Sequence, residues 1–346
     1  STIPTEDVFR ILKEKAPDAY HDEISWFDVE PLAAASVGQV HRARLKSGEE
    51  VVVKIIKGNH EKKFKRDVRR MSRWLKIAMF ISPKLRKVGN PIALLEHVED
   101  YTLRELDLRN EINGASRLST IKEELSSDFP MPRLRFPKYY PDISNRYVLV
   151  SELVKGQTLE QGIESSSLEW DDLLELFRIH GAFMFGIGTF HGDLHPGNCI
   201  LDPNGNFVFI DNGAICEAPK KVSKSLFNFF YHLSADDKEL AFESLISLAE
   251  RRPRSDDVNK FKKDMHVIYK DFENLSVGQQ SLTEVMMRTV RSAVENAGAD
   301  YGEEGFPIIR SLMYMDGLVI RTYPDVKLIS EMRSSLDEFK FGLDLE

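Results

Sequence analysis

The sequence has little cysteine and no long apolar segment. Its 346 residues include only 2 cysteines, which is too few for a scaffold held by disulfides and is typical of a reducing compartment. A membrane-spanning helix needs a run of about 18 or more apolar residues, and no such run occurs. We therefore expect a globular protein of the cytoplasm or an organelle matrix that contacts a membrane only at its surface, if at all.

The sequence also lacks an excess of basic charge. With 47 Lys and Arg against 55 Asp and Glu, the net charge is −8, which argues against a nucleic-acid-binding chain. The hydrophobic share of 42% and the charged share of 29% are ordinary for a globular protein. Because 346 residues exceed the size at which one core usually stops growing, we expect two domains or lobes.

The order of predicted elements gives a mixed half and a mostly helical half. Alternating residues at 39–45 and a β-branched run at 50–56 predict a pair of strands. A further strand is predicted at 146–154, and mostly helical patterns follow it. We predict three parts: a helical N-terminal extension at 1–30, a β-rich lobe at 31–151, and a mostly helical lobe at 152–346.

A stretch of small residues precedes the first predicted strand pair. Counting back from Val40, the residues Ala33, Ala35 and Gly38 stand where nucleotide-binding kinases place the glycines of G-x-G-x-x-G-x-V. Small residues let the backbone approach phosphate groups. An Ala-rich segment is also typical of a helix or of close packing, so this stretch alone is a weak signal.

Lys54 ends the predicted strand Val-Val-Val-Lys. A lysine on a buried strand is costly unless it has a partner. In the kinase pattern V-A-I-K, this lysine holds the α- and β-phosphates and pairs with a helix glutamate. The alternative is a lysine on an edge strand that points into solvent.

Residues 191–198 read His-Gly-Asp-Leu-His-Pro-Gly-Asn and match H-x-D-x-x-x-x-N. In kinases, the Asp of this loop accepts a hydroxyl proton and the Asn ligates a metal. The spacing of four between His191, His195 and Cys199 would also suit a zinc-binding helix face. The glycines and the proline between them would break such a helix. A purely structural loop is the third interpretation.

The triplet Asp211-Asn212-Gly213 follows a short predicted strand, where kinases carry D-F-G. Together with Asn198, Asp211 would offer the hard oxygen ligands that Mg²⁺ prefers. Isolated triplets of this kind are mostly turns. Here the four motifs occur in the order that a kinase fold demands, and that order favours the functional interpretation.

With these motifs in place, the sequence resembles the UbiB/ABC1/ADCK (Coq8-type) family of atypical kinase-like proteins. Residues 31–41 resemble the Ala-rich loop of that family. Residues 105–111, Glu-Leu-Asp-Leu-Arg-Asn-Glu, resemble its E-x-D motif and the helix glutamate, and 190–198 resemble its catalytic loop. The resemblance implies an α+β, two-lobed protein-kinase-like fold, with a small β-rich N-lobe carrying extra helices and a mostly helical C-lobe.

The resemblance also implies roles for individual residues. Lys54 would pair with Glu111, and Asp193 would be the catalytic aspartate. Asn198 and Asp211 would be the Mg²⁺ ligands. Further nucleotide contacts are implied for the Ala-rich loop, the acidic pair and the hinge between the lobes: Ala33, Ala34, Ala35, Ser36, Val37, Gly38, Val40, Glu105, Asp107, Glu152 and Val154.

By this resemblance the chain would bind ATP or ADP with Mg²⁺ and act as an ATPase or phosphotransferase linked to isoprenoid or quinone lipids, as in ubiquinone biosynthesis. The string at 191–198 also resembles aminoglycoside and choline phosphotransferases, which leaves a small-molecule phosphotransferase as an alternative. Asn212 replaces the phenylalanine that normally packs under the glutamate-bearing helix, and no K-x-G-Q segment precedes the Ala-rich stretch. Both departures favour a third interpretation, a nucleotide-binding pseudokinase that regulates a protein partner.

The segment 61–87 is strongly basic. It carries eleven Lys or Arg against two acidic residues. We predict a helix over 60–82 whose residues Phe64, Val68, Met71, Leu75 and Met79 share one face. Such a helix can lie on an anionic lipid surface, or it can simply be solvated. No aromatic base-stacking platform accompanies it, so we expect no nucleic-acid binding.

Overall fold

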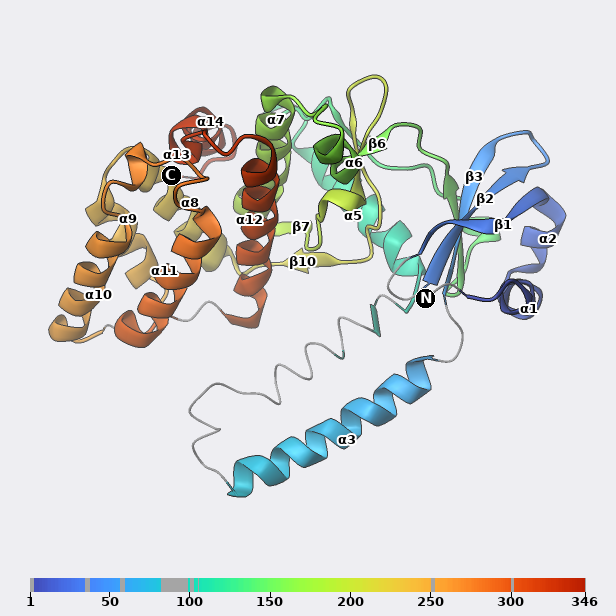
Figure 1. Ribbon diagram of the computed structural model, residues 1–346, viewed down its shortest axis with the longest axis horizontal. Helices are drawn as coiled ribbons and strands as arrows, with labels where there is room; N and C mark the ends of the chain where they lie inside the picture. Colours follow the sequence, from blue (N-terminus) through green and yellow to red (C-terminus); the bar gives the residue numbers. More distant parts are fainter. Residues whose placement is uncertain are drawn as a thin grey trace. The chain divides into compact units, whose positions relative to one another are not determined.

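The computed structural model describes residues 3–34, 38–56, 60–81, 99, 103–104, 106–249, 253–299 and 302–345. They fall into two compact units (Figure 1). Unit 1 comprises Ser1–Arg117, Phe136–Val154 and Asp211–Ala214, and unit 2 comprises Leu118–Arg135, Lys155–Ile210 and Ile215–Glu346. The chain leaves unit 1 after Val154, near the predicted boundary at 151/152. In addition, Leu118–Arg135 belongs to unit 2 and Asp211–Ala214 belongs to unit 1, so no single boundary in the sequence separates the two units.

Unit 1 is built on a four-stranded antiparallel sheet with the order β1-β2-β3-β5. The strands are β1 (Ile24–Ala34), β2 (Gly38–Leu45), β3 (Glu50–Ile56) and β5 (Val148–Glu152). Because side chains alternate along a strand, Val51, Val53 and Ile55 share one face. They pack there with the helices α1 (Thr5–Lys15) and α2 (Asp18–Glu23).

The predicted N-terminal helical extension ends earlier than residue 30. The helix α2 stops at Glu23, and Trp26 lies on β1 opposite Arg44 of β2. Trp, Phe and Val favour strands, but they form one here because they pair with β2, which follows the Ala-rich stretch in the sequence. This pairing makes β1 an edge strand of the sheet.

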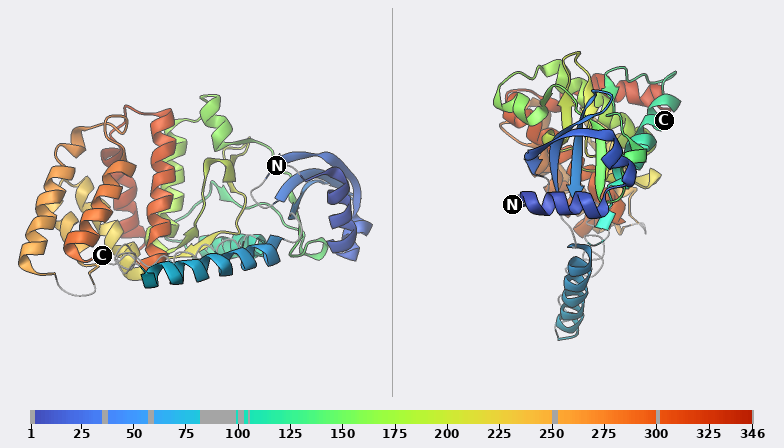
Figure 2. Two further views of the ribbon diagram at one scale, coloured as in Figure 1. Left: turned by 60° about the horizontal axis from the view of Figure 1, so that its bottom comes forward. Right: turned by 90° about the vertical axis from the view of Figure 1, so that its right-hand side faces the viewer.

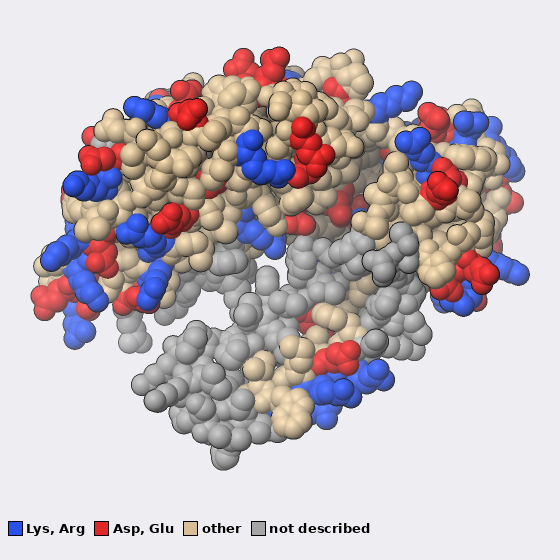
Figure 3. Space-filling view, in the orientation of Figure 1, with Lys and Arg blue, Asp and Glu red and all other residues tan. Residues whose placement is uncertain are grey.

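The predicted helix at 60–82 is confirmed as α3 (His60–Ile81). Of the residues predicted to share one face, Val68 is buried and Met71 is 54% exposed, and the neighbouring Trp74 is 66% exposed. Periodicity places such side chains along one stripe, but it does not fix how much of that stripe is covered. Lys and Arg side chains gather around the described part of this helix (Figure 3).

Unit 2 contains two small sheets and a large set of helices. One sheet has the order β4-β9-β8-β6, and the other pairs β10 with β7. The strands are β4 (Leu134–Arg135), β6 (Gln157–Thr158), β7 (Thr189–His191), β8 (Cys199–Leu201), β9 (Phe207–Phe209) and β10 (Ile215–Glu217). The predicted hairpin with its turn at Asn204-Gly205 is present as β8 and β9, and Gly205 adopts a φ of 79°.

The helices of unit 2 enclose an aromatic core. Phe183, Phe190, Phe209 and Phe229 are among its fully buried side chains. Figure 2 shows α7 and α12 side by side. The helix α5 (Arg109–Glu124) begins in unit 1 and ends in unit 2; the other helices are α6 (Leu159–Glu164), α7 (Trp170–Gly181), the π-helical turn η3 (Ala182–Ile187), α8 (Lys220–Ser234), α9 (Lys238–Ile246), α10 (Ser255–Ile268), α11 (Leu282–Ala297), α12 (Gly302–Thr322), α13 (Leu328–Glu331) and α14 (Arg333–Gly342).

The described helices have no membrane-spanning segment. Within that part of the chain, none is both long enough and apolar enough to cross a bilayer.

Candidate active site

Lys54 lies on the face of β3 that is opposite α1. Alternation along the strand turns it away from Val53 and Ile55 and toward the side where Ile56 and Leu149 form a second apolar cluster with Leu108. The beginning of α5 packs on this cluster through Ile112. The sheet and this helix therefore bring the lysine and the first turn of α5 together.

Two carboxylates of unit 1 bind the Lys54 ammonium. Its Nζ donates to Glu111 Oε1 of α5 at 2.5 Å, and it lies 3.1 Å from Asp211 Oδ2. The Lys54 and Glu111 side chains are only 13% and 8% exposed, whereas that of Asp211 is 43% exposed. The pair of Lys54 with Glu111 that the resemblance implied is present, and Asp211 is the accessible member of the cluster.

Two carboxylates face one ammonium in this cluster. Burial lowers the pKa of Lys54, but the charges of Glu111 and Asp211 outweigh burial and hold the pKa above its ordinary value. The lysine therefore stays protonated, and the partly exposed carboxylate of Asp211 offers the kind of oxygen ligand that a divalent cation such as Mg²⁺ prefers.

Asn212 occupies a buried position that the sequence reasoning assigned to an apolar ring. It is fully buried, and its Nδ2 donates to the Tyr139 hydroxyl at 3.1 Å. Tyr139 of unit 1 thus supplies the polar partner that this buried amide needs. Burial, followed by the charge of Glu111, raises the pKa of Tyr139, so its hydroxyl keeps its proton.

The backbone of Asp211 has a φ of 59°, in the left-handed region, where aspartate and asparagine are enriched among the residues other than glycine. Ser166, Asp236, Asp271 and Asp344 have similar φ values, so this conformation by itself does not mark a functional position. The side chain of Asp211 pairs with Lys54, and the adjacent Asn212 is buried.

The Ala-rich stretch is described only in part. Ala33 and Ala34 are exposed at the end of β1, Gly38 and Val40 lie on β2, and the predicted contacts at Ala35, Ser36 and Val37 lie outside the described residues. A Cβ on Gly38 would be 2.2 Å from the Ile55 carbonyl oxygen. The close approach of two strands therefore requires this glycine, whether or not a phosphate group also does.

The predicted hinge and acidic pair have partners of their own. The amide of Glu152 donates to Lys138 O at 2.8 Å, and that of Leu153 donates to Glu50 O at 3.3 Å. A role for the backbone of Glu152 and Val154 in holding adenine stays a prediction. Asp107 accepts two bonds from the Arg109 guanidinium at 2.9 and 2.6 Å, which lower its pKa; Glu105 lies outside the described residues.

The catalytic loop of unit 2 (191–198) begins on β7 and ends just before β8. The Asp193 carbonyl accepts bonds from the His195 amide at 2.7 Å and from Asn198 Nδ2 at 3.0 Å. Because this bond engages the amide nitrogen of Asn198, its Oδ1 is the end left for a cation. The Ile210 amide donates to Asn198 O at 2.9 Å, so the β8–β9 hairpin places Asn198 beside the residue that precedes Asp211 in the chain.

The zinc-binding helix considered above is not formed. His191 lies on β7, His195 precedes a short 3₁₀ turn, and Cys199 begins β8. The two histidines use Nδ1 to accept bonds from the backbone amides of Asp193 and Gly197, and Cys199 is buried with a raised pKa. These residues shape the loop, and their four-residue spacing does not place them on one face of a helix.

Three side chains at these sites were missed by the sequence reasoning. Tyr139 contacts Asn212 in unit 1, and Arg310 and Tyr314 of α12 contact the catalytic loop in unit 2. The contacts of Arg310 and Tyr314 span 118 and 121 residues of sequence. Their spacing of four on a helix was the only available signal, and it is shared by many residue pairs that have no role.

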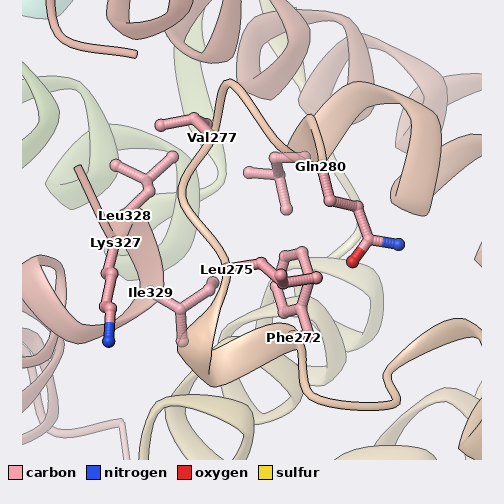
Figure 4. A pocket seen from close by; sticks show the side chains of 8 residues that line it. Phe272, Leu275, Val277, Gln280, Lys327, Leu328 and Ile329 are labelled. Atoms are coloured by element: carbon pink, nitrogen blue, oxygen red, sulfur yellow. The ribbon is translucent and has the colours of Figure 1, made fainter. Parts of the chain in front are cut away.

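Two apolar pockets of unit 2 are too small to compete as substrate sites. The one in Figure 4, between Phe272, Leu275 and Ile329, has a cavity volume of about 10 Å³, and the one beside Trp170 and Met315 has about 20 Å³. Such volumes accommodate about one water molecule. The polar groups described above remain the candidates for chemistry.

A small antiparallel sheet with a paired lysine, a loop of the form H-x-D-x-x-x-x-N and a following D-x-G segment define a protein-kinase-like fold. The chain belongs to a particular branch of this class. Residues 1–245 match the family of the ABC1 atypical kinase-like domain, and this confirms the expected family and the α+β kinase-like fold.

Curated relatives carry the description "Probable protein kinase UbiB". Those from Vibrio atlanticus (strain LGP32) and Aliivibrio fischeri (strain MJ11) are each 27% identical over 90% of this chain. The chain spans 57% of the length of these relatives. A solved structure described as the complex of Rv3197 with erythromycin, from Mycobacterium tuberculosis, is similar in fold, with a TM-score of 0.59 and 20% identity over 94% of this chain and 84% of that one.

Proposed function

We propose that this chain binds ATP with Mg²⁺ and transfers or hydrolyses its γ-phosphoryl group. The observation that carries the proposal is the Lys54–Glu111–Asp211 cluster, in which a buried, protonated lysine lies beside an exposed carboxylate. A lysine held by a helix glutamate is the group that kinases direct at the α- and β-phosphates. Membership of a kinase-like family gives independent support.

Two residues carry the hard oxygen donors that Mg²⁺ prefers. Asp211 offers an exposed carboxylate oxygen. Asn198 uses its side-chain nitrogen to donate to Asp193, so its Oδ1 can serve as a ligand. These two residues would hold Mg²⁺, which would neutralise charge on the phosphate groups. Lys54 would bind phosphate oxygens, and Glu111 would keep the lysine in place.

Asp193 would orient the acceptor hydroxyl and take its proton. In this step the acceptor oxygen bonds to the γ-phosphorus, and the bond from that phosphorus to the bridging oxygen breaks. ADP leaves with the electron pair of the broken bond, and the proton passes to the Asp193 carboxylate. With water as the acceptor the same step is ATP hydrolysis.

The acceptor that we propose is an isoprenoid or quinone-like lipid near an anionic membrane surface. The support lies in α3, where Met71 and Trp74 are exposed on a helix rich in arginine. Exposed apolar side chains among cations suit a lipid interface. Sedimentation with vesicles that contain anionic lipid, compared with purely zwitterionic vesicles, tests this part, and equal binding to both would contradict it.

Equilibrium binding of ATP–Mg²⁺ to wild type and to Lys54→Met tests the proposal directly. We expect the variant to lose at least about tenfold in affinity, since a charge-assisted contact to phosphate is worth about 1.5–3 kcal/mol. The matched control is Lys138→Met, because Lys138 also pairs with a glutamate of unit 1, Glu49, but on the surface at 2.9 Å. Equal affinities for all three proteins would refute the assignment of Lys54.

A further inference from the structure

Two side chains of α12 contact consecutive residues of the catalytic loop. Arg310 Nη2 donates to the Gly192 carbonyl at 2.5 Å, and the Tyr314 hydroxyl donates to Asp193 Oδ1 at 2.9 Å. The two side chains are four residues apart on one helix and therefore share a face. All four residues belong to unit 2. Because they act on adjacent residues, these two contacts fix both the position and the orientation of this part of the loop.

The loop's internal bonds hold its backbone rather than the carboxylate. The Asp193 amide donates to His191 Nδ1 at 3.2 Å, and the Asp193 carbonyl accepts from His195 and Asn198. Among the described residues, the hydrogen bond to the carboxylate itself comes from Tyr314. The phenol therefore supplies a constraint on the side-chain torsions of Asp193 that the loop does not supply.

Arg310 brings a guanidinium to the loop position where protein kinases carry arginine. Protein kinases have arginine before the catalytic aspartate, in the order H-R-D, whereas this chain has Gly192 there. A glycine brings no guanidinium, and it leaves its carbonyl open to close approach. Arg310 brings a guanidinium to this carbonyl from a helix 118 residues further along the chain.

The surroundings of Tyr314 keep the phenol in place as a donor. Its ring meets the His195 ring edge to face, with centroids 5.8 Å apart and an interplanar angle of 88°. Leu312 and Met315 on the same helix are buried in the core. Burial, and then the bond to Asp193, raise the pKa of Tyr314, so the hydroxyl remains protonated at neutral pH.

We propose that Tyr314 and Arg310 are positioning residues for Asp193. Arg310 fixes the peptide that precedes the aspartate, and Tyr314 occupies Oδ1 so that Oδ2 is directed at the acceptor hydroxyl. This inference rests on the proposed function for its catalytic consequence. The motifs alone assign catalysis to the loop, and this inference adds the helix α12 to the residues that position it.

Steady-state ATP turnover by Tyr314→Phe, with Tyr323→Phe as the matched control, tests the catalytic consequence. The Tyr323 hydroxyl donates to Leu168 O at 2.8 Å, so the control loses a similar bond in the same unit, away from the loop. We expect Tyr314→Phe to lower kcat about tenfold, equivalent to about 1.4 kcal/mol, with KM and the ATP–Mg²⁺ affinity unchanged. A kcat equal to that of the control overturns the inference.

Hydrogen exchange of the peptide that covers residues 189–199 tests the anchoring without relying on turnover. We expect faster exchange in Tyr314→Phe and in Arg310→Met than in wild type and Tyr323→Phe, and partial recovery in Arg310→Lys, which keeps a donor for the Gly192 carbonyl. Exchange at the wild-type rate in all variants would refute the anchoring. Failure of wild type to bind ATP–Mg²⁺ would instead refute the proposed function and leave the exchange result valid.

Discussion

The two groups of candidate residues are held by different forces. In unit 1, Lys54, Glu111 and Asp211 are linked by ion pairs between mostly buried groups. In unit 2, Asp193 is held by neutral groups: the His191 imidazole, the His195 amide, the Asn198 side-chain amide and the Tyr314 phenol. The carboxylate of Asp193 therefore has a single hydrogen-bond partner among the described residues, whereas Lys54 is bound by two carboxylates.

This difference predicts which property each group controls. Removing one member of a buried ion pair leaves an uncompensated charge, which costs stability as well as binding. Removing the charge of Asp193 disturbs fewer partners and should act mainly on chemistry. The predictions below separate stability from turnover, from the largest expected effect to the smallest.

Asp193→Asn should abolish most turnover and leave nucleotide binding intact. General-base catalysis contributes about 10²–10⁴-fold in enzymes, and the amide cannot take the proton. Single-turnover ATP hydrolysis and equilibrium ATP–Mg²⁺ binding measure the two effects separately. A variant that hydrolyses ATP within a few-fold of the wild-type rate would remove Asp193 from its assigned role.

Glu111→Gln should destabilise unit 1 and weaken ATP binding together. The Glu111 side chain is 8% exposed, and breaking a buried pair costs about 3–5 kcal/mol; because Asp211 still neutralises Lys54, we expect the lower end of that range. Denaturant unfolding of Glu49→Gln is the control, since Glu49 pairs with Lys138 on the surface. If both variants have the same unfolding midpoint as the wild type, the Lys54–Glu111 pair does not contribute to the stability of unit 1.

Tyr139→Phe should lower stability by about 1 kcal/mol, because it removes the hydroxyl that accepts from buried Asn212. Combining it with Asn212→Leu should restore part of the loss, since both polar partners are then absent. A double-mutant cycle of unfolding free energies measures this coupling. Strictly additive losses would show that the two side chains do not act as a pair.

Asp202→Asn should lower stability by an amount that depends on pH. Burial raises the pKa of Asp202, but the bonds from Asn206 and then Arg135 outweigh burial and hold the pKa below its ordinary value. A lowered folded-state pKa contributes stability above the unfolded value of about 3.9 and loses it as pH falls through the folded value. Melting temperatures of wild type and variant should therefore differ at pH 7, and the difference should shrink as the pH falls from about 4 through the lower pKa of the folded state.

The sequence predicted those parts of the fold that depend on local pattern. The strand that ends at Lys54, the helix α3 and the hairpin that separates Asn198 from Asp211 follow from alternation, periodicity and turn residues. The resemblance to the family also implied Glu111 as the partner of Lys54, and the two are paired. These features need only neighbouring residues or a known family motif.

The remaining features depend on pairing across the chain. The strand β1 was missed because its partner β2 holds it, and the polar partner of Asn212 could not be foreseen because Tyr139 lies 73 residues away in the sequence. Tyr314 was missed for the same reason. A polar side chain looks out of place in a sequence until its partner is known, and only the folded chain supplies that partner.

The most direct test of the central claim is a thermal-shift titration of wild type and Asp211→Asn with ATP, with and without Mg²⁺. A ligand at about 100 times its Kd adds about 2.7 kcal/mol of stability. The account predicts a rise in the wild-type Tm that is larger with Mg²⁺ and a loss of the Mg²⁺-dependent part in the variant. No shift of the wild-type Tm with any nucleotide, or an identical Mg²⁺-dependent shift in both proteins, would contradict it.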